Sequence, residues 1–151
     1  MQTNKVKYIA PFIGLIQSVD SEKLLLEIDK QAGKIGRTIP CLLQIYIASE
    51  ETKFGWDIEE VSSFFADDKI SEFKNICIKG LMGMASNSTN KVLVRNEFAN
   101  LKSLFEKLQA YDNLTNSKME TLSMGMSSDF LMAAEEGSTM VRMGSAIFGS
   151  R

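Results

Sequence analysis

The sequence predicts an α/β protein with a parallel β-sheet, built from about five βα units. Short apolar runs rich in β-branched residues alternate along the 151 residues with segments whose apolar residues recur every three or four positions. This alternation is typical of parallel strands joined by right-handed helical crossovers. The length fits one domain, residues 1–151, but is short for a closed barrel of eight such units, which needs about 250 residues.

Five apolar segments are predicted to be strands. The second is almost uninterrupted apolar sequence, as expected of a parallel strand covered on both faces. Small or polar residues lie at or just after the ends of the others, which is typical of strand-to-helix junctions. The predicted strands are residues 12–19, 39–48, 76–84, 120–126 and 139–144.

A helix is predicted after each strand. Asp20 and Ser21 can cap the first, which ends near Gly33 or Gly36. Its buried face is predicted to hold Leu24, Leu25, Ile28 and Ala32.

The remaining helices have comparable signals. Asp57, with Glu60 three residues later, predicts the second helix start. The third and longest helix presents Val94, Phe98, Leu101, Leu104, Phe105 and Leu108 on one face. Ser127 or Ser128 is expected to cap a short fourth helix, residues 129–136, ended by Gly137, and a last helical turn follows Gly144.

Composition excludes several classes of function. The net charge of −2 gives no basic surface for nucleic acid or an acidic membrane. No apolar stretch is long enough to span a membrane, and the first residues lack the apolar region of a signal peptide. We therefore expect a cytoplasmic protein. Cys41 and Cys77 are expected to be free buried thiols, with a disulfide between them as the alternative.

The chain has no histidine. Catalytic triads with histidine and the usual zinc ligand sets are therefore excluded, and no metal site is expected. Any chemistry must come from lysine, arginine, serine, carboxylates, backbone amides or a bound cofactor.

The last two strand ends are the strongest candidate for a ligand site. In parallel α/β sheets ligands lie at the carboxyl ends of the strands, and barrels often bind phosphate after their last two strands. Ser127 or Ser128 would add a hydroxyl to the N–H groups of the following helix, and Arg142 would add a cation. The alternative is an ordinary serine-capped helix and an arginine paired with a core carboxylate.

Two other strand ends carry weaker signals. Lys53 can face an anionic ligand or be a solvated loop residue. Methionines at the end of the third strand, Met82 and Met84, can pack on a flat ring or simply fill the core.

Four motifs, in order, resemble the pyridoxal phosphate homeostasis proteins, also known as the proline synthetase co-transcribed family. They are Glu-Glu-Thr-Lys-Phe-Gly (50–55), Gly-Leu-Met-Gly-Met (80–84), Leu-Ser-Met-Gly-Met-Ser-Ser-Asp (122–129) and Gly-Ser-Thr-Met-Val-Arg-Met-Gly-Ser-Ala-Ile-Phe-Gly (137–149). The family shares the barrel of the alanine racemase N-terminal domain. The resemblance therefore implies a partial TIM (β/α) barrel of about five alanine-racemase-like βα units.

The resemblance also implies a ligand and its contacts. Family members bind pyridoxal 5′-phosphate and buffer its free concentration, with no established turnover, so the chain is expected not to be an enzyme. The phosphate would be bound by Ser127 and by the backbone amides of Gly144 and Ser145. Arg142 would lie near the pyridine nitrogen, while Met124 and Met84 would line the pocket. Lys53 and Gly55 match the family's Lys-x-Gly.

The beginning of the chain does not fit a whole family member. Residues 1–5 resemble a segment just beyond the family's third barrel strand, so about three strands and the Schiff-base lysine are expected to be missing. Cofactor binding would then be non-covalent at best. Three explanations stay open: a shortened reading frame or gene, a deliberate fragment, or a homo-oligomer that pairs the exposed sheet edges.

Two other functions compete with cofactor binding. One is an enzyme that acts on a small phosphorylated metabolite through the same anion site, with Lys53, Asp129 or Glu50 as its base. The other is a ligand-free oligomeric remnant of a barrel.

Overall fold

A single sheet of five parallel strands organises the chain. The computed structural model describes residues 1–49, 54–112, 114 and 116–149. Its strands lie in the order β1-β2-β3-β4-β5, so each strand pairs with its neighbours in sequence. Their bounds are Ile16–Val19, Ile39–Tyr46, Ile76–Met84, Ser117–Met126 and Met140–Arg142. The predicted α/β class, the parallel sheet and the five βα units are confirmed.

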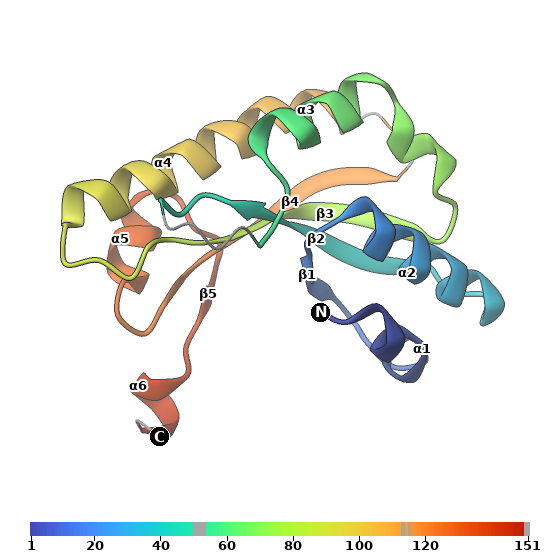
Figure 1. Cartoon of the computed structure of the whole chain (residues 1–151), viewed down its shortest axis with the longest axis horizontal. Coiled ribbons are helices and arrows are strands. Elements are labelled where there is room, and N and C mark those ends of the chain that lie inside the picture. Colours follow the sequence, from blue (N-terminus) through green and yellow to red (C-terminus); the bar gives the residue numbers. More distant parts are fainter. Residues whose placement is uncertain (50–53, 113, 115, 150–151) are drawn as a thin grey trace.

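The sheet is curled into part of a barrel. Figure 1 shows α3 and α4 along one side of the sheet, while the outer strands β1 and β5 both turn toward the other side. A hydrogen bond of 3.0 Å from the Ser123 hydroxyl on β4 to the Gln17 side chain on β1 crosses two intervening strands. Only a strongly curved sheet brings these side chains together. We call this inner side the concave face.

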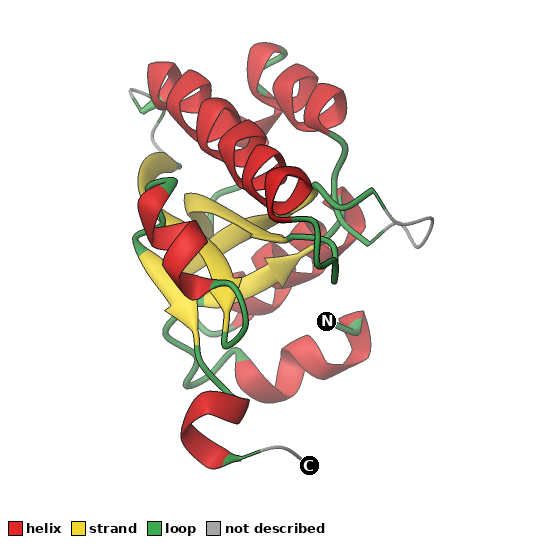
Figure 2. Ribbon diagram, turned by 90° about the vertical axis from the view of Figure 1, so that its left-hand side faces the viewer, coloured by secondary structure: helices red, strands yellow, loops and turns green. Residues whose placement is uncertain are grey.

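The described structure has six α-helices, and the longest of them lies across the convex face of the sheet (Figure 2). Their bounds are α1 Val6–Ile9, α2 Glu22–Lys34, α3 Ile58–Ala66, α4 Lys91–Leu108, α5 Phe130–Glu135 and α6 Ser145–Phe148. Short 3₁₀ turns span Thr3–Lys5, Lys69–Glu72 and Gln109–Tyr111. All apolar positions predicted for the buried faces of α2 and α4 are buried. Asp57 and Glu60 form the expected capping box at the start of α3.

The first strand is shorter than predicted. Residues 12–15 do not extend it, because the N–H groups of Phe12 and Ile13 both donate to the Ile9 carbonyl in a turn that follows α1. Phe12 is accordingly 73% exposed. Helix α1 was not predicted, since its four residues are too few to show a helical period.

After the second strand the chain folds back against the sheet at Gly55 and Trp56. The Trp56 N–H donates to the Gln44 carbonyl at 2.9 Å, and the Trp56 carbonyl accepts the Tyr46 N–H at 3.0 Å. A Cβ at Gly55 would lie 2.6 Å from the Gln44 oxygen, so only glycine permits this approach. Trp56 is buried, and its indole N–H donates to the Val19 carbonyl at 3.0 Å.

Two expectations from composition can be compared with the structure. Both cysteines are free, but only Cys41 is buried, whereas Cys77 is partly exposed. Within the described residues, no helix is long and apolar enough to cross a membrane.

The sheet ends on both sides in a strand with a single neighbour. In the described part of the chain, β1 pairs only with β2, and β5 pairs only with β4. Near the β5 edge, α6 exposes Ile147 and Phe148, the latter 86% exposed. Oligomer formation through these edges stays a prediction.

Candidate functional site at the carboxyl ends of the strands

Ser127 links the turn after β4 to the first turn of α6. Its hydroxyl oxygen accepts the N–H groups of Gly144 at 3.1 Å and Ala146 at 3.2 Å. The expectation that Ser127 or Ser128 caps α5 is wrong. Asp129 occupies that N-cap position, and its carboxylate accepts the Met126 N–H at 2.6 Å. The Ser127 side chain thus bonds to the next βα unit and not to the helix that follows it in sequence.

The chain therefore brings together the residues that the sequence predicts for phosphate. The N–H groups of Gly144 and Ala146 both donate to the Ser127 hydroxyl, and Ser145 lies between these two residues in the sequence. The Ser145 N–H donates to no acceptor among the described residues. Backbone N–H groups grouped in this way are suited to an anion, and the hydroxyl marks an oxygen position within the group.

Arg142 is held against the concave face by three neutral oxygens. Its Nη1 donates to the Ser123 carbonyl at 2.9 Å and to the Ser123 hydroxyl at 2.7 Å. Its Nη2 donates to the Gly83 carbonyl at 3.0 Å. The guanidinium thereby joins β3, β4 and β5, the strands whose carboxyl ends carry the predicted site.

The charge of Arg142 is not neutralised by a direct ion pair. No carboxylate in the described ranges lies within ion-pair distance of it, so the alternative of an arginine paired with a core carboxylate is not found. Burial lowers the pKa of the guanidinium, and the negative charge of Asp129 partly opposes that effect. Arginine nevertheless stays protonated in proteins. The site therefore carries a fixed positive charge.

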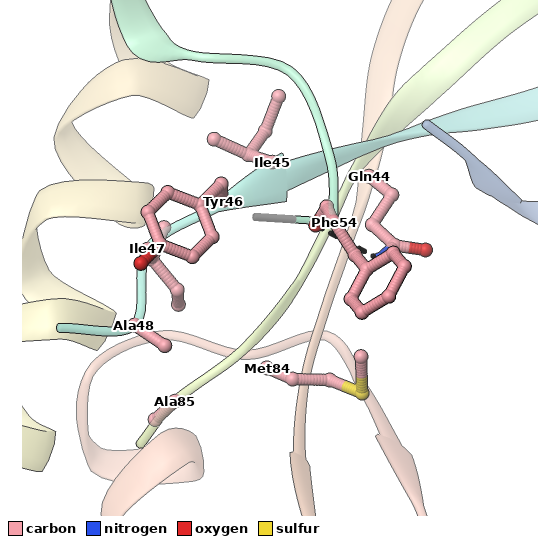
Figure 3. Close-up of a pocket in the computed structure, with 8 residues that line it drawn as sticks. All are labelled: Gln44, Ile45, Tyr46, Ile47, Ala48, Phe54, Met84 and Ala85. Carbon is pink, nitrogen blue, oxygen red and sulfur yellow. Dashed lines mark hydrogen bonds between the residues drawn. The ribbon is translucent and has the colours of Figure 1, made fainter. Parts of the chain in front are cut away.

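The two predicted pocket methionines lie in different surroundings. Met84, at the end of β3, is 42% exposed and lines a cavity of about 140 Å³ with Gln44, Tyr46 and Phe54 (Figure 3). The Gln44 amide donates to the Phe54 carbonyl at 3.2 Å across this cavity. Met124 is fully buried in the hydrophobic core.

Charged groups that could serve an enzyme are few in the described structure. Asp129, a candidate base, is already held by the Met126 N–H. Lys53 and Glu50, the other two candidates, lie outside the described residues. Across the ranges that are described, no group of three or more cysteine, aspartate or glutamate side chains is placed to hold a metal ion.

Sequence reasoning missed a buried carboxylate beneath the site. Glu97 on α4 is only 4% exposed. Its carboxylate accepts the N–H and hydroxyl of Ser86 after β3, both at 2.7 Å, and the N–H and hydroxyl of Ser49 after β2, both at 3.0 Å. An acid among the apolar positions of a predicted helix face, together with serines just after the two preceding strands, is the signal that could have indicated it.

Gln17 and Ser123 were missed as well. They lie on the concave face and connect Arg142 to β1. Each is a polar residue inside an apolar strand, and strand alternation would have placed both on the inner side. Their meeting could not have been predicted, because it depends on the curvature of the sheet.

The fold defines a class: α/β proteins whose parallel strands curl into part of a (β/α) barrel. The family model for the N-terminal domain of alanine racemase matches residues 2–151. Within this class the chain belongs to the pyridoxal phosphate homeostasis protein family. Its relatives include pyridoxal phosphate homeostasis proteins of Aquifex aeolicus, 38% identical over 151 residues, and of Synechocystis sp., 30% identical.

Solved structures agree with this membership. PipY of Synechococcus elongatus matches with a TM-score of 0.88 and 31% identity over 99% of this chain and 67% of PipY. PipY with pyridoxal phosphate (PLP) bound matches with a TM-score of 0.83 and 30% identity, over the same shares of the two chains. An alanine racemase of Clostridium difficile, at 16% identity and a TM-score of 0.79 over 100% of this chain and 40% of the racemase, shows the shared barrel fold.

The chain is shorter than these relatives. It is covered completely by the match to the Aquifex aeolicus protein but spans 64% of that protein's length, and it spans 67% of the Synechocystis protein.

Proposed function

We propose that this chain binds pyridoxal 5′-phosphate and serves pyridoxal phosphate homeostasis without turning over a substrate. Membership of the family supports pyridoxal 5′-phosphate as the ligand. The structure of PipY with PLP bound, which matches 99% of this chain, supports a binding site within this fold. When bound, this cofactor supplies an aldehyde and an electron-accepting ring. The residues of this chain bind and orient it.

The phosphate is proposed to lie where Ser127 meets the first turn of α6. The observation that carries the proposal is the position of the Ser127 hydroxyl between the N–H groups of Gly144 and Ala146. A phosphate oxygen can take the place of the hydroxyl as acceptor, with the hydroxyl turning to donate and the Ser145 N–H adding a further donor. Serine and backbone amides thereby hold the anion without a lysine.

The ring is proposed to extend from there toward Arg142 and Met84. Arg142 has N–H donors beyond those bound to Ser123 and Gly83, and they suit a ring nitrogen that accepts a hydrogen bond. Met84 offers a flexible, partly exposed thioether for contact with a flat ring. Met124 lies in β4 and packs in the hydrophobic core.

Binding is proposed to be non-covalent in this chain. Of the described lysines, Lys79 and Lys118 are the two that lie in strands, and both pair with Glu120, at 3.0 and 2.5 Å. They lie nearer the amino ends of β3 and β4, away from the proposed phosphate position. No described lysine therefore combines a strand position with a location at the site.

A titration tests the proposed ligand. Fluorescence or absorbance titration of the chain with pyridoxal 5′-phosphate should show saturable binding, and inorganic phosphate should compete. Ser127→Ala should weaken binding about tenfold or more, because a hydrogen bond to a charged group contributes about 1.5–3 kcal/mol. Ser128→Ala is the matched control, since the Ser128 hydroxyl bonds to no described residue, and it should bind like the unmodified chain. No saturable binding, or equal losses in both variants, would reject the site.

Reduction tests the non-covalent part of the proposal. The chain is mixed with pyridoxal 5′-phosphate, treated with borohydride, and its intact mass is measured. The expected spectrum lacks a stoichiometric adduct. Quantitative labelling of a single lysine, mapped by peptide mass, would show a Schiff base instead.

A further inference from the structure

A chain of hydrogen bonds connects β1 to Arg142 across the concave face. The Ser123 hydroxyl donates to Gln17 Oε1 at 3.0 Å, and Arg142 Nη1 donates to the same hydroxyl at 2.7 Å. Ser123 is fully buried and Gln17 is half-buried. These bonds therefore form in a region of low dielectric, where they are stronger than in water.

The direction of each bond is set by the number of protons available. A serine hydroxyl has one proton, and Gln17 accepts it, so the lone pairs of the oxygen are left to accept from Arg142. If Gln17 lacked an accepting oxygen, the buried proton of Ser123 would need another acceptor. The hydroxyl would then turn, and its bond with Arg142 would weaken.

The remaining bonds complete the orientation of the guanidinium. Both Nη1 protons are taken by Ser123, through its hydroxyl and its carbonyl, and one Nη2 proton is taken by Gly83. Of the five N–H donors of an arginine, two remain for a ligand. Their directions are fixed because the planar group is held at three points.

We propose that Gln17 is a positioning residue for the ligand site: through Ser123, it fixes the Arg142 guanidinium so that its two remaining donors meet an accepting ring atom. The identity of that ring as pyridoxal 5′-phosphate rests on the proposed function. The orientation of Arg142 by Gln17 does not, because each of these hydrogen bonds joins two groups of the protein itself.

Three variants separate the steps of this proposal. Gln17→Met removes the accepting oxygen at similar size, and Gln17→Glu keeps an accepting oxygen at the same position. Ser123→Ala removes the hydroxyl between the two side chains. Ser18→Ala is the control, since Ser18 is the next residue of β1 and its hydroxyl bonds to no described residue.

The first measurement uses the ligand-free chain. Nitrogen-detected NMR of the Arg142 guanidinium should show slow rotation about its C–N bonds in the unmodified chain and in the Gln17→Glu and Ser18→Ala variants. Gln17→Met and Ser123→Ala should speed this rotation several-fold. Unchanged rotation in Gln17→Met would overturn the proposal, whatever the ligand.

The second measurement compares pyridoxal 5′-phosphate with inorganic phosphate. Gln17→Met and Ser123→Ala should weaken pyridoxal 5′-phosphate binding about fivefold or more, the effect expected of one hydrogen bond, and change phosphate affinity less than about twofold. Equal losses for both ligands would mean that Gln17 only stabilises the fold, and would also overturn the proposal. If the unmodified chain binds no pyridoxal 5′-phosphate, the proposed function fails, while the NMR result still decides the role of Gln17.

Discussion

The carboxylate of Glu97 accepts both the backbone N–H and the hydroxyl of Ser86, each at 2.7 Å. Because the same carboxylate also accepts both donors of Ser49, one buried side chain on α4 holds the chain segments that leave β2 and β3. Ala85, just before Ser86, and Ala48, just before Ser49, line the cavity beside Met84. Glu97 thus holds in place two chain segments that line this cavity, although it does not line the cavity itself.

Removing the Glu97 carboxylate should destabilise the fold. Glu97→Ala leaves three donors, the Ser49 hydroxyl and the N–H and hydroxyl of Ser86, without this acceptor, while the Ser49 N–H keeps the Ser86 hydroxyl oxygen. We expect the change to lower the free energy of unfolding by about 3 kcal/mol. Glu106→Ala on the same helix removes an exposed partner of Lys102, an ion pair of 3.3 Å, and should cost about 0.5 kcal/mol or less. Urea unfolding of both variants measures the difference. Similar midpoints would show that the four bonds contribute little.

The sequence predicted the parts of the fold that depend on local pattern. The apolar positions of α2 and α4 and the bounds of β3 came directly from residue spacing. It also indicated Ser127 and Arg142 as polar residues at strand ends, where a parallel sheet places its ligand. Both residues lie beside the last two strand ends, and their joint use by one ligand stays a prediction.

The contacts that the sequence did not predict join residues that are far apart along the chain. Ser127 looked like a cap for its own helix, but its hydroxyl bonds across to Gly144. Gln17 and Ser123 are 106 residues apart, and only the curvature of the sheet makes them neighbours. Capping rules consider a few adjacent residues and therefore cannot identify a partner on another βα unit.

Gly80 is expected to be intolerant of any side chain. It has a φ of +146°, and a Cβ there would lie 1.8 Å from the carbonyl oxygen of Thr121 on β4. Gly80→Ala should therefore separate β3 from β4 locally and destabilise the chain by about 3 kcal/mol or more. Gly14→Ala is the control, because a Cβ at Gly14 meets no atom within 4 Å and should change stability little. Thermal melts compare the two, and an unchanged melting temperature in Gly80→Ala would contradict the close approach of β3 to β4 at this residue.

The open edges of the sheet predict self-association. β1 and β5 present backbone groups without a neighbouring strand in the described structure, and Phe148 lies exposed next to the β5 edge. We expect sedimentation velocity to show oligomers that increase with concentration. Phe148→Ser should reduce them, whereas Leu26→Ser, which removes an exposed leucine on α2, should not. A monomer that melts cooperatively at all concentrations would count against assembly through these edges.

The Cys41 thiol should make the stability of the chain sensitive to alkaline pH. Burial, with a smaller contribution from Cys77, raises the pKa of this thiol from 9.0 to about 12. A pKa that is higher in the folded chain than in the unfolded chain means that the unfolded chain loses its proton first as the pH rises. The contribution to stability is therefore complete below about pH 9 and is lost between about pH 9 and 12, at up to about 1.4 kcal/mol per pH unit.

Urea unfolding at about pH 8, 9.5 and 11 measures this slope. Cys41→Ala is expected to be less stable than the unmodified chain at the lowest of these pH values, because it leaves a small gap in the core. It should nevertheless lose stability more slowly as the pH rises, because its unfolded state has no thiol at this position to ionise. Parallel slopes for the two proteins would show that other groups control the alkaline response.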